Sequence, residues 1–131
     1  MSNYEIGARK RSIARVSCRA GTGKVMINGL NLDVYEPEMA RLMIKEPMII
    51  AGDTASKIDF TANVQGGGII GQASAIRQAI SKLLVGHEKT LKKKFLDYDR
   101  SLLVADVRRT EPHKPSRSKD GPRTHKQRSK R

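Results

Sequence analysis

The sequence predicts an α+β fold, a mixed sheet with helices packed on one face, followed by an extended basic C-terminal tail. Residues 11–20 and 57–64 alternate between apolar and polar side chains, which is the period of a strand. Residues 69–84 place apolar side chains at spacings of three and four, which is the period of an amphipathic helix. After Val107 the chain has no aliphatic, aromatic, Met or Cys residue, so nothing there can build a core.

The predicted strands have distinct faces. In residues 11–20 one face is small and mostly apolar, and the other is largely cationic. A turn at residues 21–23 and a short strand at 24–28 follow, so we expect a hairpin between 11–20 and 24–28. Residues 57–64 form the clearest strand. The inward positions of the two long strands are Ser12, Ala14, Val16, Cys18, Ala20, Ile58, Phe60, Ala62 and Val64.

Helix signals fill the intervening segments. Pro37 favours a helix start, and Met39, Leu42 and Met43 recur at helical spacing until Pro47, which we expect to interrupt the helix. The long helix after the glycine run is expected to end at a Gly86 cap. A shorter charged helix at about 88–96 and a last short strand at 102–105 complete the predicted body.

The charge of the chain points to a polyanionic partner. The 26 basic and 13 acidic residues give a net charge of +13 and a pI near 10.3, which favours a nucleic acid. Residues 1–107 hold 16 basic and 11 acidic side chains, a net charge of +5. Residues 108–131 hold 10 basic and 2 acidic side chains, a net charge of +8. Since the second segment has no apolar surface to bury, we predict a folded RNA-binding body at 1–107 and a basic tail at 108–131 that is disordered when free.

Other classes of function find little support. No stretch reaches about 18 apolar residues, and the first residues hold no apolar signal segment. We therefore expect no membrane partner, and we expect the chain to be located in a reducing cytoplasm. The single cysteine, Cys18, rules out an internal disulfide and a Cys-based zinc site, and the three histidines keep no ligand spacing. We predict no catalytic residue, no metal and no cofactor.

Two glycine motifs resemble nucleotide-binding loops. Gly66-x-Gly68-x-x-Gly71 has the dinucleotide spacing, but the fingerprint needs a second parallel strand, and the segment after Gly86 reads as a lysine-rich helix. "GTGK" (21–24) lacks the first Gly and the final Ser/Thr of a phosphate-binding loop. We therefore expect a tight hairpin turn at 21–24. For the glycines at 66–68 two roles stay open: an anion site at a helix start, or a turn whose φ angles only Gly tolerates.

The cations that precede and follow these elements are candidate RNA contacts. Arg9, Lys10, Arg11 and Arg15 lie along one strand and its entry, and Lys92–Lys94 lie in the charged helix, although both groups could be solvated faces. Aromatic residues are too few for a base-stacking platform, so contacts should rest on phosphates and shape. A basic DNA-compacting protein and a small nucleotide-dependent enzyme are the alternatives.

Four segments together resemble the small-subunit ribosomal protein nine family. They are "GARKRSIARV" (7–16), "GTGKVMING" (21–29), "VQGGGIIGQASAIRQAISKLL" (64–84) and the terminal "KQRSKR" (126–131). Their order and spacing match along nearly the whole chain, and the glycine segment with its continuation is highly specific. The segment "YDRSLLVADVRRTEP" (98–112) resembles the archaeal and eukaryotic branch, and within it the archaeal one is favoured.

The resemblance implies a fold like the second domain of small-subunit ribosomal protein five and a structural role in the head of the small ribosomal subunit. It also implies a monomer within the ribosome, neighbouring ribosomal proteins, and a tail that reaches the anticodon stem-loop of peptidyl-site tRNA. The predicted tRNA contacts are Arg128, Lys130 and Arg131. The predicted ribosomal RNA contacts are Arg9, Lys10, Arg11, Arg15, Gly66, Gly67, Gly68, Lys92, Lys93, Arg108, Arg109, Lys114, Arg117 and Arg123.

Overall fold

The structure is a computed structural model that describes residues 3–110. Five strands form one mixed sheet with the order β1-β2-β5-β3-β4. The central strand β5 is antiparallel to β2 and parallel to β3, and the outer pairs β1–β2 and β3–β4 are antiparallel. The strands are β1 (Tyr4–Arg9), β2 (Ser12–Ala20), β3 (Val25–Ile27), β4 (Leu30–Asn31) and β5 (Ile58–Gln65).

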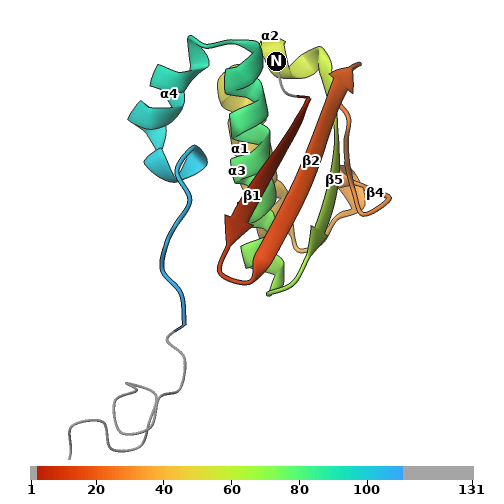
Figure 1. Cartoon of the computed structure of the whole chain (residues 1–131). Coiled ribbons are helices and arrows are strands. Elements are labelled where there is room, and N and C mark those ends of the chain that lie inside the picture. The colour runs from red at the N-terminus through yellow and green to blue at the C-terminus, as the bar shows by residue number, and fades with distance from the viewer. Residues whose placement is uncertain (1–2, 111–131) are drawn as a thin grey trace, which may run out of the picture.

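Helices cover one face of this sheet and leave the other open (Figure 1). The long helix α3 packs against β1, β2 and β5, and α1 packs against α3. The predicted α+β architecture, with helices on one side of a mixed sheet, is therefore confirmed. The helices are α1 (Glu38–Ala51), α2 (Asp53–Ser56), α3 (Ile69–His87) and α4 (Leu91–Tyr98), with 3₁₀ turns η1 (Leu32–Val34) and η2 (Arg100–Leu102).

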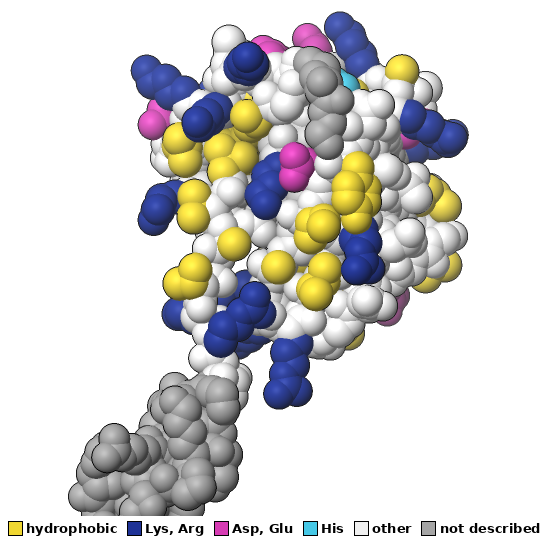
Figure 2. Space-filling model, in the orientation of Figure 1, with side chains coloured by type: hydrophobic (Ala, Val, Ile, Leu, Met, Phe, Trp, Pro, Cys, Tyr) yellow, Lys and Arg dark blue, Asp and Glu magenta, His cyan; other side chains and the backbone are white. Residues whose placement is uncertain are grey.

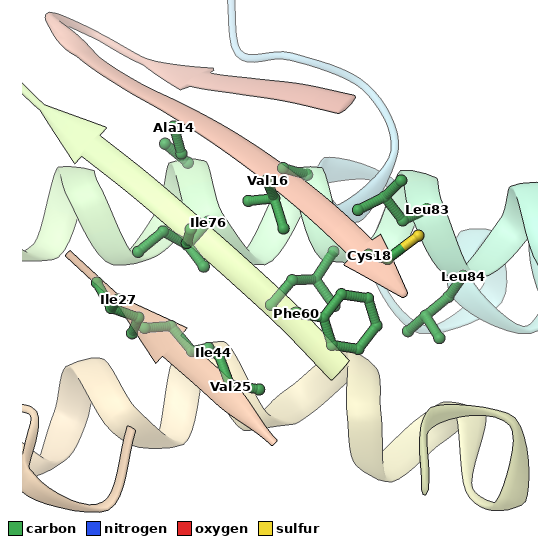
Figure 3. Close-up of a cluster of buried hydrophobic side chains, with 14 of the residues drawn as sticks. Ala14, Val16, Cys18, Val25, Ile27, Ile44, Phe60, Ile76, Leu83 and Leu84 are labelled. Carbon is green, nitrogen blue, oxygen red and sulfur yellow. The ribbon is translucent and has the colours of Figure 1, made fainter. Parts of the chain in front are cut away.

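The core lies between the sheet and α3. Side chains from β2, β5 and α3 meet there, with Phe60 of β5 fully buried (Figure 3). Burying each large apolar side chain contributes about 1.5–3 kcal/mol, so this layer supplies much of the driving force for folding. The predicted inward positions of β2 and β5 are buried except Ala20, which is exposed at the end of β2.

The predicted hairpin between residues 11–20 and 24–28 is wrong. The eight-residue strand β5 pairs along its whole length with β2 and separates β2 from the three-residue β3. Residues 21–24 therefore form a loop that passes the end of β5 instead of a tight hairpin turn. The hairpin partner of β2 is β1, joined through a turn in which Lys10 has a φ of 54°.

Helix boundaries also differ from the prediction. Pro47 lies inside α1 and does not interrupt it, because burial of the proline ring and of its neighbours in the core offsets one missing N–H. The helix α3 runs through Gly86 to His87, and the charged helix begins three residues later than expected. Residues 102–105 form no strand. Leu102 instead ends η2 with its side chain buried.

Candidate nucleic-acid interface

The glycine loop between β5 and α3 packs directly on the turn between β1 and β2. Ser12 Oγ donates a hydrogen bond to the Gly66 carbonyl oxygen at 3.0 Å, and Gln72 Nε2 donates to the same oxygen at 3.1 Å. Gly66 and Gly67 have φ angles of +79° and +63°. A Cβ on Gly66 would overlap the carbonyl oxygen of Arg11, and one on Gly67 would overlap Ser12 Oγ. These two glycines are therefore required by backbone conformation and close packing.

Gly68 differs from its two neighbours. Its φ is −96°, and a Cβ placed on it would meet no atom within 4 Å. Gly68 is the N-cap of α3 and has no side chain to bond the first helical amides, and the first turn contains no acidic residue. Unpaired amides at a helix N-terminus carry partial positive charge. The start of α3 is thus an open, electropositive end beside the β1–β2 turn.

A carboxylate ties the segment after η2 to this turn. Asp106 forms an ion pair with Arg9 of β1 and another with Arg108 Nη2 at 2.6 Å. Hydrogen bonds from Arg108, and then the charge of Arg9, hold the pKa of Asp106 well below its ordinary value. Lys10 and Arg11 are exposed in the turn itself. Figure 2 shows Lys and Arg side chains at this end of the body and also at the opposite end.

We call this group of residues the basic end. It consists of Arg9, Lys10, Arg11, the loop Gly66–Gly68 and Arg108. The structure thereby brings together predicted contacts that are separated by up to about a hundred positions in the sequence. Since Arg9 shares a carboxylate with Arg108, Lys10 and Arg11 are the cations of the turn that remain available to an incoming phosphate.

Other predicted contacts lie elsewhere. Arg15 lies on the open face of the sheet, between its cross-strand neighbours Ile6 and Asn63. Lys92 and Lys93 are exposed on α4, toward the opposite end of the body from the β1–β2 turn (Figure 1). Arg109 is exposed beside Arg108. Six predicted contacts lie outside the described residues: Lys114, Arg117, Arg123, Arg128, Lys130 and Arg131.

Sequence reasoning missed the residues that position the basic end. Ser12 is the one polar side chain on the inward face of β2, and that exception to the apolar pattern is a signal that could have identified it. Gln72 follows the glycine motif and carries no comparable signal. Asp106 pairs with a residue 97 positions away, a contact that no local pattern encodes.

The nucleotide-binding motifs have structural explanations. Within residues 3–110 no strand follows α3, so the glycine spacing lacks the second parallel strand of a dinucleotide site. In the 21–24 loop the backbone amides of Thr22 and Lys24 donate to Asp59 Oδ1 at 2.8 and 2.9 Å. These bonds lower the pKa of Asp59, with that from Lys24 the largest cause. The loop amides are thus directed to a carboxylate of the same chain.

One potentially reactive pair was not predicted. Cys18 Sγ lies 3.2 Å from His87 Nε2, and burial raises the pKa of the Cys18 thiol, which disfavours the thiolate needed for nucleophilic attack. Among the described residues, no three His, Cys, Asp or Glu side chains are grouped so that they could hold a metal ion. Within the same residues, no helix has the length and apolar character to span a membrane.

Comparison with known proteins establishes the family. The model of the family described as ribosomal protein S9/S16 matches residues 7–131. A protein of Methanococcus maripaludis strain C7 named small ribosomal subunit protein uS9 is 46% identical over 128 residues, covering 96% of each chain. The protein of the same name from Methanococcus vannielii is 43% identical over the same coverage. These relatives are archaeal, as the segment at 98–112 indicates, and the chain belongs to the ribosomal protein S9/S16 family.

Proposed function

We propose that the basic end of the body binds ribosomal RNA in the head of the small subunit and that the C-terminal residues contact peptidyl-site tRNA. As a member of this family, the chain is a structural, non-enzymatic constituent of the small ribosomal subunit in the cytoplasm, with ribosomal RNA and ribosomal proteins as partners. Within the subunit we propose a single copy of the chain in the head. The observation that carries the proposal is the convergence of Lys10, Arg11 and the open start of α3.

The basic end has the chemistry of a phosphate-backbone site. Exposed cations attract phosphates and release counterions, and free helical amides can donate hydrogen bonds to phosphate oxygens. Gly68 has open space around its Cα, so a nucleic-acid backbone can approach closely there. Because no base-stacking aromatics are part of this group, the contact should depend on RNA shape more than on base identity. Arg15, and Lys92 with Lys93, are proposed as separate contacts on the sheet face and α4.

The C-terminal residues extend this interface. The segment 108–131 holds 10 basic residues in 24, and fully extended it could span at most about 80 Å. We propose that Arg109, Lys114, Arg117 and Arg123 follow ribosomal RNA phosphates and that Arg128, Lys130 and Arg131 reach the anticodon stem-loop. If all ten cations contact single-stranded RNA, the log–log slope of affinity against salt approaches about −7.

Charge reversal at two places on the body tests the RNA site. The variant Lys10→Glu with Arg11→Glu removes the available cations of the turn. Lys57→Glu with Lys89→Glu makes the same change of charge at two exposed lysines that are not proposed as RNA contacts. Binding to small-subunit ribosomal RNA is measured by filter retention at several salt concentrations. We expect the turn variant to bind more weakly, with a salt slope shallower by about 2. An equal loss in both variants would show that bulk charge, not the basic end, governs binding.

Duplex DNA of the same length is the control for the alternative function. A DNA-compacting protein should bind it as tightly as it binds structured RNA, because its contacts would depend on charge alone. We expect tighter binding to the ribosomal RNA, and equal affinities for the two nucleic acids would favour the DNA-compacting alternative.

A further inference from the structure

Large apolar side chains are exposed on the outward side of α1 and on the neighbouring β4 and η1. Met39, Leu42 and Ile49 follow one another on α1 at spacings of three and seven, which places them on one side of the helix. Ala40 and Ile44 point the other way into the core, as Figure 3 shows for Ile44. We name as the α1 face the residues Leu30, Val34, Met39, Leu42 and Ile49, which are 56, 64, 62, 52 and 74% exposed.

A groove adjoins this face. It has a volume of about 500 Å³ and lies between α1, the 22–25 loop and η1, with Leu32, Met48 and Ile49 among its apolar lining residues. Asp33 of η1 is held to α1, since Arg41 Nη1 donates to its carbonyl oxygen at 2.8 Å and Lys45 Nζ lies 3.7 Å from its carboxylate. The apolar residues of η1 and α1 are therefore fixed as one surface.

The charge around the α1 face is opposite to that of the rest of the body. Residues 30–56 hold five carboxylates and two cations, a net charge of −3. The other residues between 3 and 110 hold 16 basic and 6 acidic side chains. The segment that carries the α1 face is therefore acidic overall, although Lys24 and Lys45 also line the groove. Its exposed Leu, Met and Ile side chains offer RNA no ionic contact. An exposed apolar patch rimmed by charge is typical of a protein-binding site.

We infer that the α1 face and its groove bind a basic segment of a neighbouring protein in the small subunit. Apolar side chains of that segment would enter the groove beside Ile49, and its lysines or arginines would pair with the exposed Glu36 and Glu38. Charge complementarity of this kind orients a partner and excludes RNA. The inference rests on the proposed function in one respect. If ribosomal RNA binds the basic end, the oppositely charged α1 face stays available to bind a protein.

Site-specific cross-linking in intact small subunits tests this inference. A photoreactive phenylalanine analogue replaces Leu42 in one variant and Ile49 in another, and Tyr98 of α4, 59% exposed, in the control. From both α1 positions we expect an adduct that resists ribonuclease and whose partner peptide, identified by mass spectrometry, is net basic. The control should not produce that adduct. RNA adducts alone, an acidic partner peptide, or no adduct at both α1 positions would overturn the inference.

A charged variant separates the protein contact from the RNA contact. Leu42→Glu with Ile49→Glu changes only exposed side chains, so the body should fold as before. We expect cross-linking from Met39 to the same neighbour to fall about tenfold, with affinity for free ribosomal RNA unchanged. A parallel loss of RNA affinity would make the α1 face an RNA surface and refute the inference. Failure of the unmodified chain to bind ribosomal RNA would instead refute the proposed function, whatever the protein adducts show.

Discussion

Replacing Gly66 with alanine tests the packing of the glycine loop on the β1–β2 turn. Gly66 has a φ of +79°, a left-handed conformation that costs an L-residue roughly 1–2 kcal/mol. The new Cβ would also lie within 3.0 Å of the Arg11 carbonyl oxygen. Because that atom belongs to the backbone, the turn itself must move, which costs about 1–3 kcal/mol. The free energy of unfolding should therefore fall by about 2–5 kcal/mol, a large part of a typical total of about 5–15.

Gly68→Ala is the matched control. Gly68 lies two residues away at the same loop, with negative φ and no neighbouring atom within 4 Å of the added Cβ. Its substitution should change the free energy of unfolding by less than about 1 kcal/mol. The gain from a less flexible unfolded chain is opposed by the poorer N-cap that Ala makes compared with Gly. Urea denaturation of the full chain, followed by circular dichroism, measures both variants. A Gly66→Ala variant as stable as wild type, or equal losses in the two variants, would refute this account of the loop.

Two further predictions concern carboxylates with lowered pKa values. Asp59→Asn should destabilise the chain at pH 7. Because the pKa of Asp59 is lowered in the folded state, the ionised carboxylate stabilises the fold at pH values above its unfolded pKa near 3.9. The difference in free energy of unfolding between the variant and wild type, measured by urea titration, should therefore vanish as pH falls through the folded pKa. A difference independent of pH would contradict this. Asp106→Asn should loosen the tie between Arg9 and Arg108 and speed amide exchange of residues 106–108 by hydrogen-exchange mass spectrometry. Unchanged exchange there would show that the ion pairs do not hold this segment.

The sequence predicted those elements whose apolar pattern is long. The inward faces of β2 and β5 and the stripe of α3 follow directly from their periods of two and about 3.6. The order of the strands in the sheet was not predictable in this way. The alternation of apolar and polar residues is the same whether β3 pairs with β2 or β5 lies between them. The pairing was decided by β5, whose eight residues all pair with β2. Met39 and Leu42 likewise have helical spacing, yet they lie on the exposed side of α1.

The candidate site was partly predictable. The basic run at 9–11 and the glycines at 66–68 were identified from charge and composition, but their contact depends on the β1–β2 turn meeting the end of β5. Of the two roles considered for the glycines, the turn with positive φ angles belongs to Gly66 and Gly67. Gly68 instead leaves the N-terminus of α3 open, as an anion site would require. The pairing of Arg9 with Asp106 depended on tertiary structure alone.

The most direct test of the central claim uses small subunits that carry the chain truncated to residues 1–107. Equilibrium binding and dissociation of peptidyl-site tRNA are compared with subunits that carry the full chain, at two salt concentrations. We predict that the truncated chain still assembles through its body, that tRNA is held more weakly, and that the difference shrinks at high salt because phosphate contacts are screened. Unchanged tRNA affinity in fully assembled subunits that carry the truncated chain would contradict the account.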